Sequence, residues 1–240
     1  MKIIGHRGAR SSGNENTVRS FERALEHHVD EIELDVRVTK DGKTVLLHDR
    51  ALTDPAGNEL AVATHTFAEL QQHKPDLNTL EEAITFINRR VPLYIEVKPG
   101  VPTAPIITIL KHFLKTGWTP QDFRLGSYNQ EILLVLHEAF PDIQKIVIEN
   151  WSSVRAVRRA DELNTKRLSM LEYWLWSGFI RAMARRGYEL YSFPPKSPQK
   201  ERLFAHIGLT GQTNNPRKAR AWAKHGLAGV ITDFPDRFEK

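Results

Sequence analysis

The feature that most constrains the fold is a regular alternation of short strand-like runs with amphipathic helical segments. The runs are rich in β-branched and aromatic residues, and the segments between them repeat their apolar residues at helical spacing. Such an alternation predicts a parallel sheet covered by helices. Eight runs fit this pattern, at residues 2–5, 31–36, 93–98, 123–128, 145–149, 167–171, 188–193 and 230–233.

Helices are expected between these runs. The 240 residues come close to the roughly 250 typical of an α/β barrel. We find no internal repeat, low-complexity segment or domain boundary. We therefore predict the α/β class, a (β/α)8 TIM barrel, with one domain over residues 1–240. The expected helices cover 17–29, 79–90, 106–115, 132–140 and 154–163, and a last one ends at 186.

Three segments lie outside the simple alternation. Asp41-Gly42 is a strong hairpin signal, so the second strand is expected to turn back along 44–48 as a small β-hairpin extension. Residues 50–76 are polar, and we predict an irregular segment with turns near 54–58. Residues 194–216 are interpreted as a short insertion after the seventh strand, with a helical pattern over 198–206. In the alternative register, residues 207–213 are themselves the seventh strand.

Composition excludes several classes of protein. No apolar run approaches the ~20 residues that span a bilayer, and the start of the chain leaves no room for a signal peptide, so we expect a cytoplasmic protein. The absence of cysteine excludes disulfides and thiolate metal sites. The net charge of +5 fits an anionic partner, but the arginines are dispersed at helical spacing. We prefer solvated helix faces, and no nucleic-acid partner.

Unusual polar residues gather at the carboxyl ends of the predicted strands. In an α/β barrel this end carries the active site. His48 returns to the same level at the end of the hairpin arm. The strand-end residues are His6, Glu33, Asp35, Glu96, Lys98, Ser127 and Asp233.

Three carboxylates in this group, Glu33, Asp35 and Glu96, suit a hard cation such as Mg²⁺ or Ca²⁺. The alternative is a salt-bridged trio on the surface. His6 and His48 are either structural histidines or a general acid–base pair beside the metal.

Two cations in the same region also allow two interpretations. Arg7 and Lys98 either pair with the three carboxylates or hold phosphate oxygens.

The motifs in this order resemble the glycerophosphodiester phosphodiesterase family, of the cytosolic bacterial type, over nearly the whole chain. The matching stretches are GHRG at 5–8, ENT at 15–17, EIELDV at 31–36, TKDG at 39–42, VLLHD at 45–49, LNTLEEA at 77–83, YIEVK at 94–98, GSYN at 126–129 and GLAGVITDFPD at 226–236. The resemblance implies a TIM barrel of the phospholipase C-like phosphodiesterase type. It also implies metal-dependent hydrolysis of small glycerophosphodiesters to sn-glycerol 3-phosphate and an alcohol.

The resemblance assigns roles residue by residue. Glu33, Asp35 and Glu96 would bind Mg²⁺ or Ca²⁺, and His6 and His48 would be the acid and base. Arg7 and Lys98 would contact the phosphate, and Asn16 would support the site near the metal. The family's aromatic seventh-strand motif is replaced here by residues 190–193 or, in the other register, by 211–214.

Two other functions stay open at this point. A lysophospholipase D-type enzyme would keep the mechanism and act on lysophospholipids, with weak contact to a membrane surface. Trp174, Trp176 and Phe179 are compatible with that contact, although we prefer packing of these aromatics between helix and barrel. A non-catalytic barrel that binds anions is disfavoured because no histidine or metal carboxylate is lost. The sequence leaves the head group, the choice between the two metals and the oligomeric state open.

Overall fold

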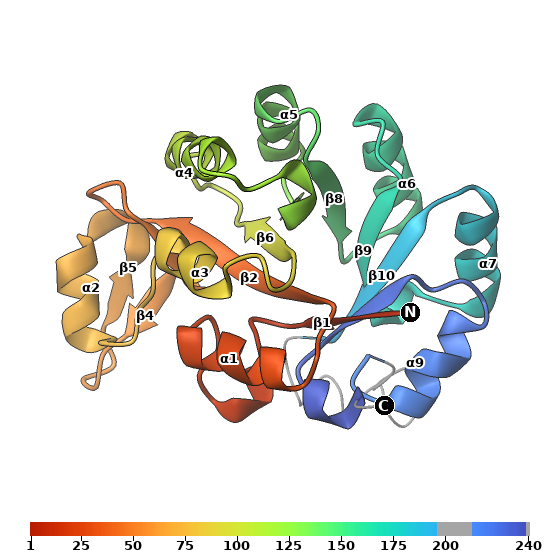
Figure 1. Cartoon of the computed structure of the whole chain (residues 1–240), viewed down its shortest axis with the longest axis horizontal. Helices are drawn as coiled ribbons and strands as arrows, with labels where there is room; N and C mark the ends of the chain where they lie inside the picture. Colours follow the sequence, from red (N-terminus) through yellow and green to blue (C-terminus); the bar gives the residue numbers. More distant parts are fainter. Residues whose placement is uncertain (196–212, 239–240) are drawn as a thin grey trace.

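Eight parallel strands close into a barrel in the computed structural model, which describes residues 1–195 and 213–238 (Figure 1). β1 pairs with β11 on one side and with β2 on the other, which closes the ring. The (β/α)8 prediction is therefore confirmed. The barrel strands are β1 (Lys2–Gly5), β2 (Glu31–Val38), β6 (Leu93–Val97), β7 (Phe123–Ser127), β8 (Gln144–Glu149), β9 (Arg167–Leu171), β10 (Glu189–Phe193) and β11 (Gly229–Thr232).

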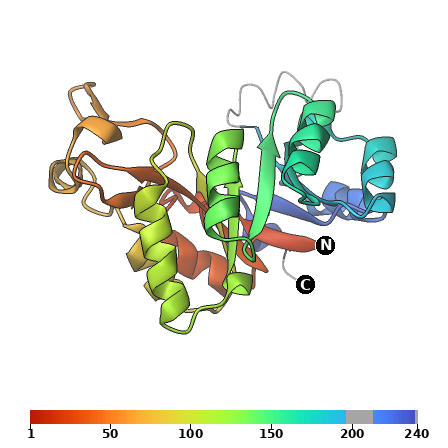
Figure 2. The same ribbon diagram turned by 90° about the horizontal axis from the view of Figure 1, so that it is seen from above.

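Helices lie outside the strands, as the view from above also shows (Figure 2). Thr79 and Glu82 form a capping box at the start of the helix expected over 79–90, with a hydrogen bond in each direction. The helix expected up to residue 186 begins only at Ser177, after a single 3-10 turn at Glu172–Trp174. The helices around the barrel are α1 (Val18–Glu26), α3 (Leu80–Ile87), α4 (Ala104–Lys115), α5 (Gln130–Ala139), α6 (Ser153–Glu162), α7 (Ser177–Arg185) and α9 (Pro216–Ala223).

The alternation along β2 decides which side chains reach the barrel interior. Ile32, Leu34 and Val36 join the core between the barrel and its helices. Glu33 and Asp35 consequently point the other way, into the barrel. On β6 the same rule places Tyr94 in the interior apolar cluster. Because of this two-residue period, neighbouring strands place their polar side chains together at one edge of the sheet.

The hairpin extension is larger than predicted. β2 pairs antiparallel with β3 (Thr44–Leu46), and Gly42 makes the turn with φ of +80°. The expectation of an irregular 50–76 segment is wrong. This segment contains a second hairpin, β4 (Ala51–Thr53) with β5 (Glu59–Ala61), and helix α2 (Phe67–His73).

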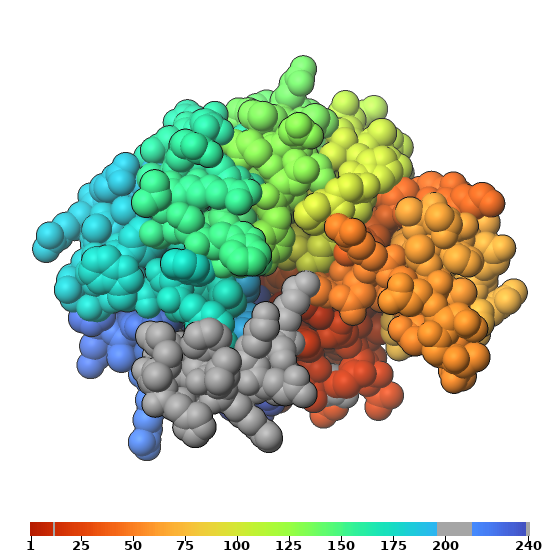
Figure 3. All heavy atoms as spheres, turned by 180° about the vertical axis from the view of Figure 1, so that it is seen from behind, coloured from red at the N-terminus to blue at the C-terminus, as the bar shows by residue number. Residues whose placement is uncertain are grey.

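The extension has its own small apolar core of Val45, Val62, Leu70 and Leu77. A Thr66–Glu69 capping box starts α2. The apolar residues here are too sparse to show a period, although the turn at 54–58 is present. The extension protrudes at one side of the barrel, in orange (Figures 1 and 3).

β10 pairs with both β9 and β11, so residues 188–193 hold the seventh place, as preferred. The helical pattern at 198–206 and nearly all of the alternative strand at 207–213 lie outside the described residues.

Within the described part of the chain, no helix combines the length and the apolar character needed to cross a membrane.

Candidate active site

A cavity of about 680 Å³ opens at the carboxyl ends of the strands. One part of its wall is polar and contains the strand-end residues that the sequence singled out. The other part is apolar and aromatic. The polar part is lined by His6, Arg7, Glu33, His48, Glu96 and Lys98.

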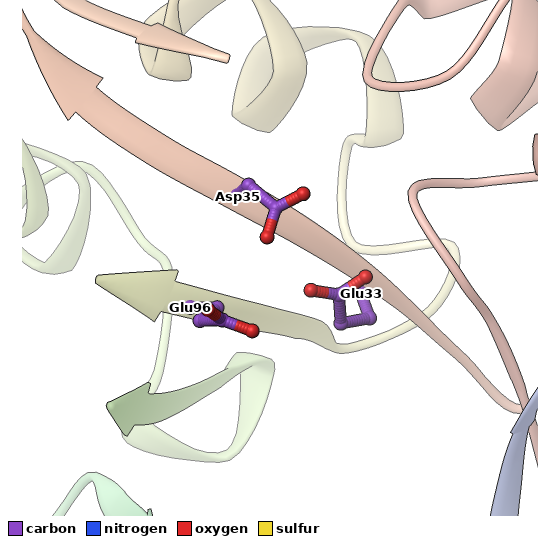
Figure 4. A group of neighbouring side chains, drawn as sticks. All are labelled: Glu33, Asp35 and Glu96. Atoms are coloured by element: carbon purple, nitrogen blue, oxygen red, sulfur yellow. The ribbon is translucent and has the colours of Figure 1, made fainter. Parts of the chain in front are cut away.

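Glu33, Asp35 and Glu96 converge from β2 and β6 (Figure 4). Asp35 and Glu96 are register partners in the sheet. One carboxylate oxygen from each residue lies within 4.8 Å of the others, and all three residues are buried. The alternative of a carboxylate trio on the surface is therefore wrong. Three buried hard oxygen donors fit the coordination that Mg²⁺ or Ca²⁺ requires.

Arg7 and Lys98 supply positive charge to this trio. Lys98 Nζ contacts a Glu96 oxygen and lies 2.5 Å from Asp35 Oδ1. Arg7 Nε lies 3.0 Å from Asp35 Oδ2, and the Arg7 backbone N–H donates to Glu33 Oε2 at 2.9 Å. Of the two interpretations from the sequence, the structure shows the first, in which Arg7 and Lys98 pair with the carboxylates.

Burial and charge push the carboxyl pKa values apart. Burial, together with the charges of Asp35 and Glu96, raises the pKa of Glu33 well above its usual value. Burial also opposes ionisation of Asp35, but Lys98 and Arg7 outweigh it and hold the pKa of Asp35 well below its usual range. The surroundings thus favour the ionised form of Asp35 and disfavour that of Glu33.

Each histidine of the cavity has a carboxylate at Nδ1. His6 Nδ1 lies 2.6 Å from Asp233 Oδ1, and His48 Nδ1 lies 2.7 Å from Asp49 Oδ1. A carboxylate at Nδ1 fixes the ring orientation and favours the tautomer with the proton on Nδ1. Nε2 then becomes the nitrogen that exchanges protons. In His6 it lies 4.0 Å from Glu33 Oε2.

Asn16 holds Asp35 from two sides. Its Nδ2 donates to Asp35 Oδ2 at 2.9 Å, and its Oδ1 accepts from the Asp35 backbone N–H at 3.1 Å. Ser127, by contrast, does not line the cavity. Its hydroxyl donates to the Val97 carbonyl at 2.7 Å, so it links β7 to β6.

Several supporting residues were not assigned to the site from the sequence. Glu15 accepts from Arg7 at 2.7 Å and from Arg10 at 2.8 Å. Asp233 accepts from Arg10 at 3.3 Å and from Asn214 at 3.3 Å. Asp233 stood out as a strand-end residue, but nothing in the sequence paired it with His6, 227 positions away.

The apolar part of the cavity includes Tyr128 and Phe193, whose rings meet edge to face with centroids 6.4 Å apart. Trp151 and Trp174 also line it. Helix packing was preferred for Trp174, Trp176 and Phe179; it holds for Phe179 but is wrong for the two tryptophans, which are exposed.

The sequence is similar to those of known glycerophosphodiester phosphodiesterases. The model of the glycerophosphoryl diester phosphodiesterase family matches residues 6–237. The Bacillus subtilis protein YqiK is 51% identical, over 98% of this chain and 96% of its own. A glycerophosphodiester phosphodiesterase of Caldanaerobacter subterraneus is 36% identical, over 98% of this chain and 94% of its own.

Among solved structures, an Oleispira antarctica phosphodiesterase in complex with the product sn-glycerol 3-phosphate has a TM-score of 0.79 at 22% identity, covering 99% of this chain and 95% of its own. That likeness shows the fold. The family match covers nearly all of the chain. The chain therefore belongs to the glycerophosphoryl diester phosphodiesterase family and is a phosphoric diester hydrolase.

Proposed function

We propose that the protein hydrolyses glycerophosphodiesters to sn-glycerol 3-phosphate and an alcohol in a reaction that depends on a divalent metal. The observation that carries the proposal is the meeting, in one cavity, of three buried carboxylates and two histidines with a carboxylate at Nδ1. The product named for the Oleispira antarctica neighbour supports the same products here.

Glu33, Asp35 and Glu96 would hold Mg²⁺ or Ca²⁺. When bound, the cation would neutralise phosphate charge as a Lewis acid. Asn16 keeps Asp35 in place through both of its hydrogen bonds. Added positive charge would also favour the ionised form of Glu33, whose pKa is raised in the protein alone.

Arg7 and Lys98 are the groups that would hold the phosphate. Both are buried cations beside the trio, and both line the cavity. A phosphodiester anion repels an incoming oxygen nucleophile. Fixed cations at the phosphoryl oxygens lower that repulsion and stabilise the charge that develops in the transition state.

His6 and His48 would divide the proton transfers. One Nε2 accepts a proton from the nucleophile, which is water or the neighbouring glycerol hydroxyl. The other histidine donates a proton to the leaving alcohol. The carboxylates at Nδ1 stabilise the imidazolium that forms in each case.

A second candidate is a lysophospholipase D-type reaction with the same groups. It is favoured by the aromatic part of the cavity, where Tyr128, Trp174 and Phe193 offer apolar surface next to the polar site. A hydrocarbon chain gains from such a wall, whereas a small polar head group does not.

The test is the release of glycerol 3-phosphate from glycerophosphocholine, after metal is stripped with a chelator and Mg²⁺ or Ca²⁺ is restored. Product that requires added metal supports the proposal. A folded protein that releases no product with either metal would refute it. Parallel assays with lysophosphatidylcholine distinguish the two candidates.

A control variant, His48→Ala, should keep the fold and metal binding and lose most turnover. Retention of near wild-type turnover would refute the acid–base role of His48.

A further inference from the structure

A group of exposed apolar side chains lies beside the cavity on two neighbouring strand-to-helix connections, and two of its members line the cavity. This tryptophan rim consists of Trp151, Val154, Trp174 and Trp176, which are between 41% and 79% exposed. It holds three of the five tryptophans of the chain. In the described part of the chain, the other exposed large apolar residues are Met1, Leu134 and Val135. The apolar exposure is therefore concentrated at one place.

The rim belongs to two neighbouring loops at the active-site end of the barrel. Trp151 lies in the β8–α6 connection and Val154 in the first turn of α6, whereas Trp174 and Trp176 lie in the β9–α7 connection. Trp174 Nε1 donates to the Asn150 carbonyl at 2.6 Å, which ties the loops together. These connections fall in the green to cyan part of the chain in Figure 1.

The four side chains differ in their relation to the cavity. Trp151 and Trp174 line it, whereas Val154 and Trp176 do not. The ring of Trp176 rests on Gly178, where an added Cβ would lie 1.9 Å from the ring. A large apolar ring held outward, away from the cavity, gains nothing from small-molecule binding. This exposure calls for a partner larger than the substrate.

The exposed charges in the part of α6 nearest the rim are basic, whereas the exposed acidic residues of this helix, Asp161 and Glu162, lie at its far end. On α6, Arg155 and Arg158 have side chains that are 51% and 74% exposed. The carboxylate that Arg155 meets, Glu149, is buried, and Glu162 lies 3.8 Å from Arg158. The chain as a whole carries +5. Amphipathic tryptophan rings beside arginines complement a surface that is apolar below and anionic above.

We infer that the tryptophan rim docks on the surface of an anionic phospholipid bilayer and turns the cavity mouth toward the lipid. The rings would enter the headgroup region, while Arg155 and Arg158 would face lipid phosphates. This inference rests on the loops and their charge and does not require the proposed reaction.

The test is cosedimentation of the full chain with vesicles of phosphatidylcholine containing phosphatidylglycerol. We compare Val154→Ser and Trp176→Ala with Val135→Ser, a matched control on α5 that is 43% exposed. Removing a rim side chain should weaken binding about threefold for Val154→Ser and about tenfold for Trp176→Ala, in line with the apolar area lost. Val135→Ser should bind like the wild type.

Two results would overturn the inference. One is a wild-type chain that stays in the supernatant at low salt, which would leave a protein partner as the occupant of the rim. The other is equal binding by all three variants. Turnover of soluble glycerophosphocholine should be unchanged in Val154→Ser and Trp176→Ala, because neither residue lines the cavity. Docking and the proposed reaction therefore fail or succeed separately.

Discussion

Asp233 and Asp49 offer a direct comparison of two carboxylates in the same relation to a histidine. Their oxygens lie 2.6 Å and 2.7 Å from Nδ1 of His6 and His48. The side chain of Asp233 is 12% exposed, but that of Asp49 is 79% exposed. Arg10 and Asn214 also hold Asp233, and together with His6 they keep its pKa well below the usual range although burial raises it.

We predict that Asp233→Asn lowers kcat by about 10²- to 10⁴-fold, the usual share of a general acid or base. An amide next to Nδ1 cannot stabilise an imidazolium, and its NH2 group favours the wrong tautomer. Asp49→Asn should cost only about tenfold, because water already competes for that carboxylate and screens its charge. KM should change little in both variants, since neither carboxylate lines the cavity.

The assay is steady-state release of glycerol 3-phosphate with saturating metal, next to thermal unfolding of each variant. A folded Asp233→Asn enzyme within threefold of wild-type kcat would refute the reasoning. So would an Asp49→Asn variant that loses more than Asp233→Asn. If Asp233→Asn does not fold, Asp233→Glu takes its place in the comparison. This variant keeps the charge but displaces it, so it should retain part of the wild-type kcat.

Three further predictions concern other parts of the chain. Burial lowers the pKa of Lys145 from 10.5 to about 8. The unfolded chain therefore binds more protons between these pH values, and the free energy of unfolding should rise with pH in this range. Urea unfolding should show this rise in the wild type and not in Lys145→Met. Gly126→Ala should lower the free energy of unfolding in the same assay by roughly 2 kcal/mol or more, because the new Cβ would lie 2.5 Å from the Tyr94 ring. An unchanged urea midpoint would contradict that packing. Trp174→Ala should lower kcat/KM for lysophosphatidylcholine several-fold more than for glycerophosphocholine; equal losses would argue against chain binding at the apolar wall.

The barrel and the polar site were predictable because both follow from the short-range spacing of apolar and polar residues along the sequence. A two-residue period along β2 puts Ile32 and Leu34 in the core, which forces Glu33 and Asp35 to the barrel interior. Parallel strands then bring their carboxyl ends to one edge. The site follows from which residues stand at those ends.

Features that depend on distant pairing were not predictable in the same way. Nothing local joins Asp233 to His6, or Glu15 to both Arg7 and Arg10. The second hairpin and α2 of the extension escaped detection because the core of the extension has only four buried apolar residues and the strands β4 and β5 have three residues each. Trp174 and Trp176 were expected to pack because apolar residues usually do, and only the loop geometry shows that they do not.

The hairpin extension described above delivers His48 from outside the ring of parallel strands. The segment from β3 through α2 packs on its own four-residue core, and Arg37 on β2 fastens the His48 carbonyl at 2.8 Å and 3.1 Å. Six of the eight proposed functional residues sit on the barrel or next to its strands, and Asn16 lies between β1 and α1. His48 instead belongs to a unit whose own cluster has four buried apolar residues. Such a unit opens at a lower free energy than the barrel. Heating should therefore abolish turnover before the barrel melts, and the enzyme should regain activity on cooling as long as the barrel has stayed intact.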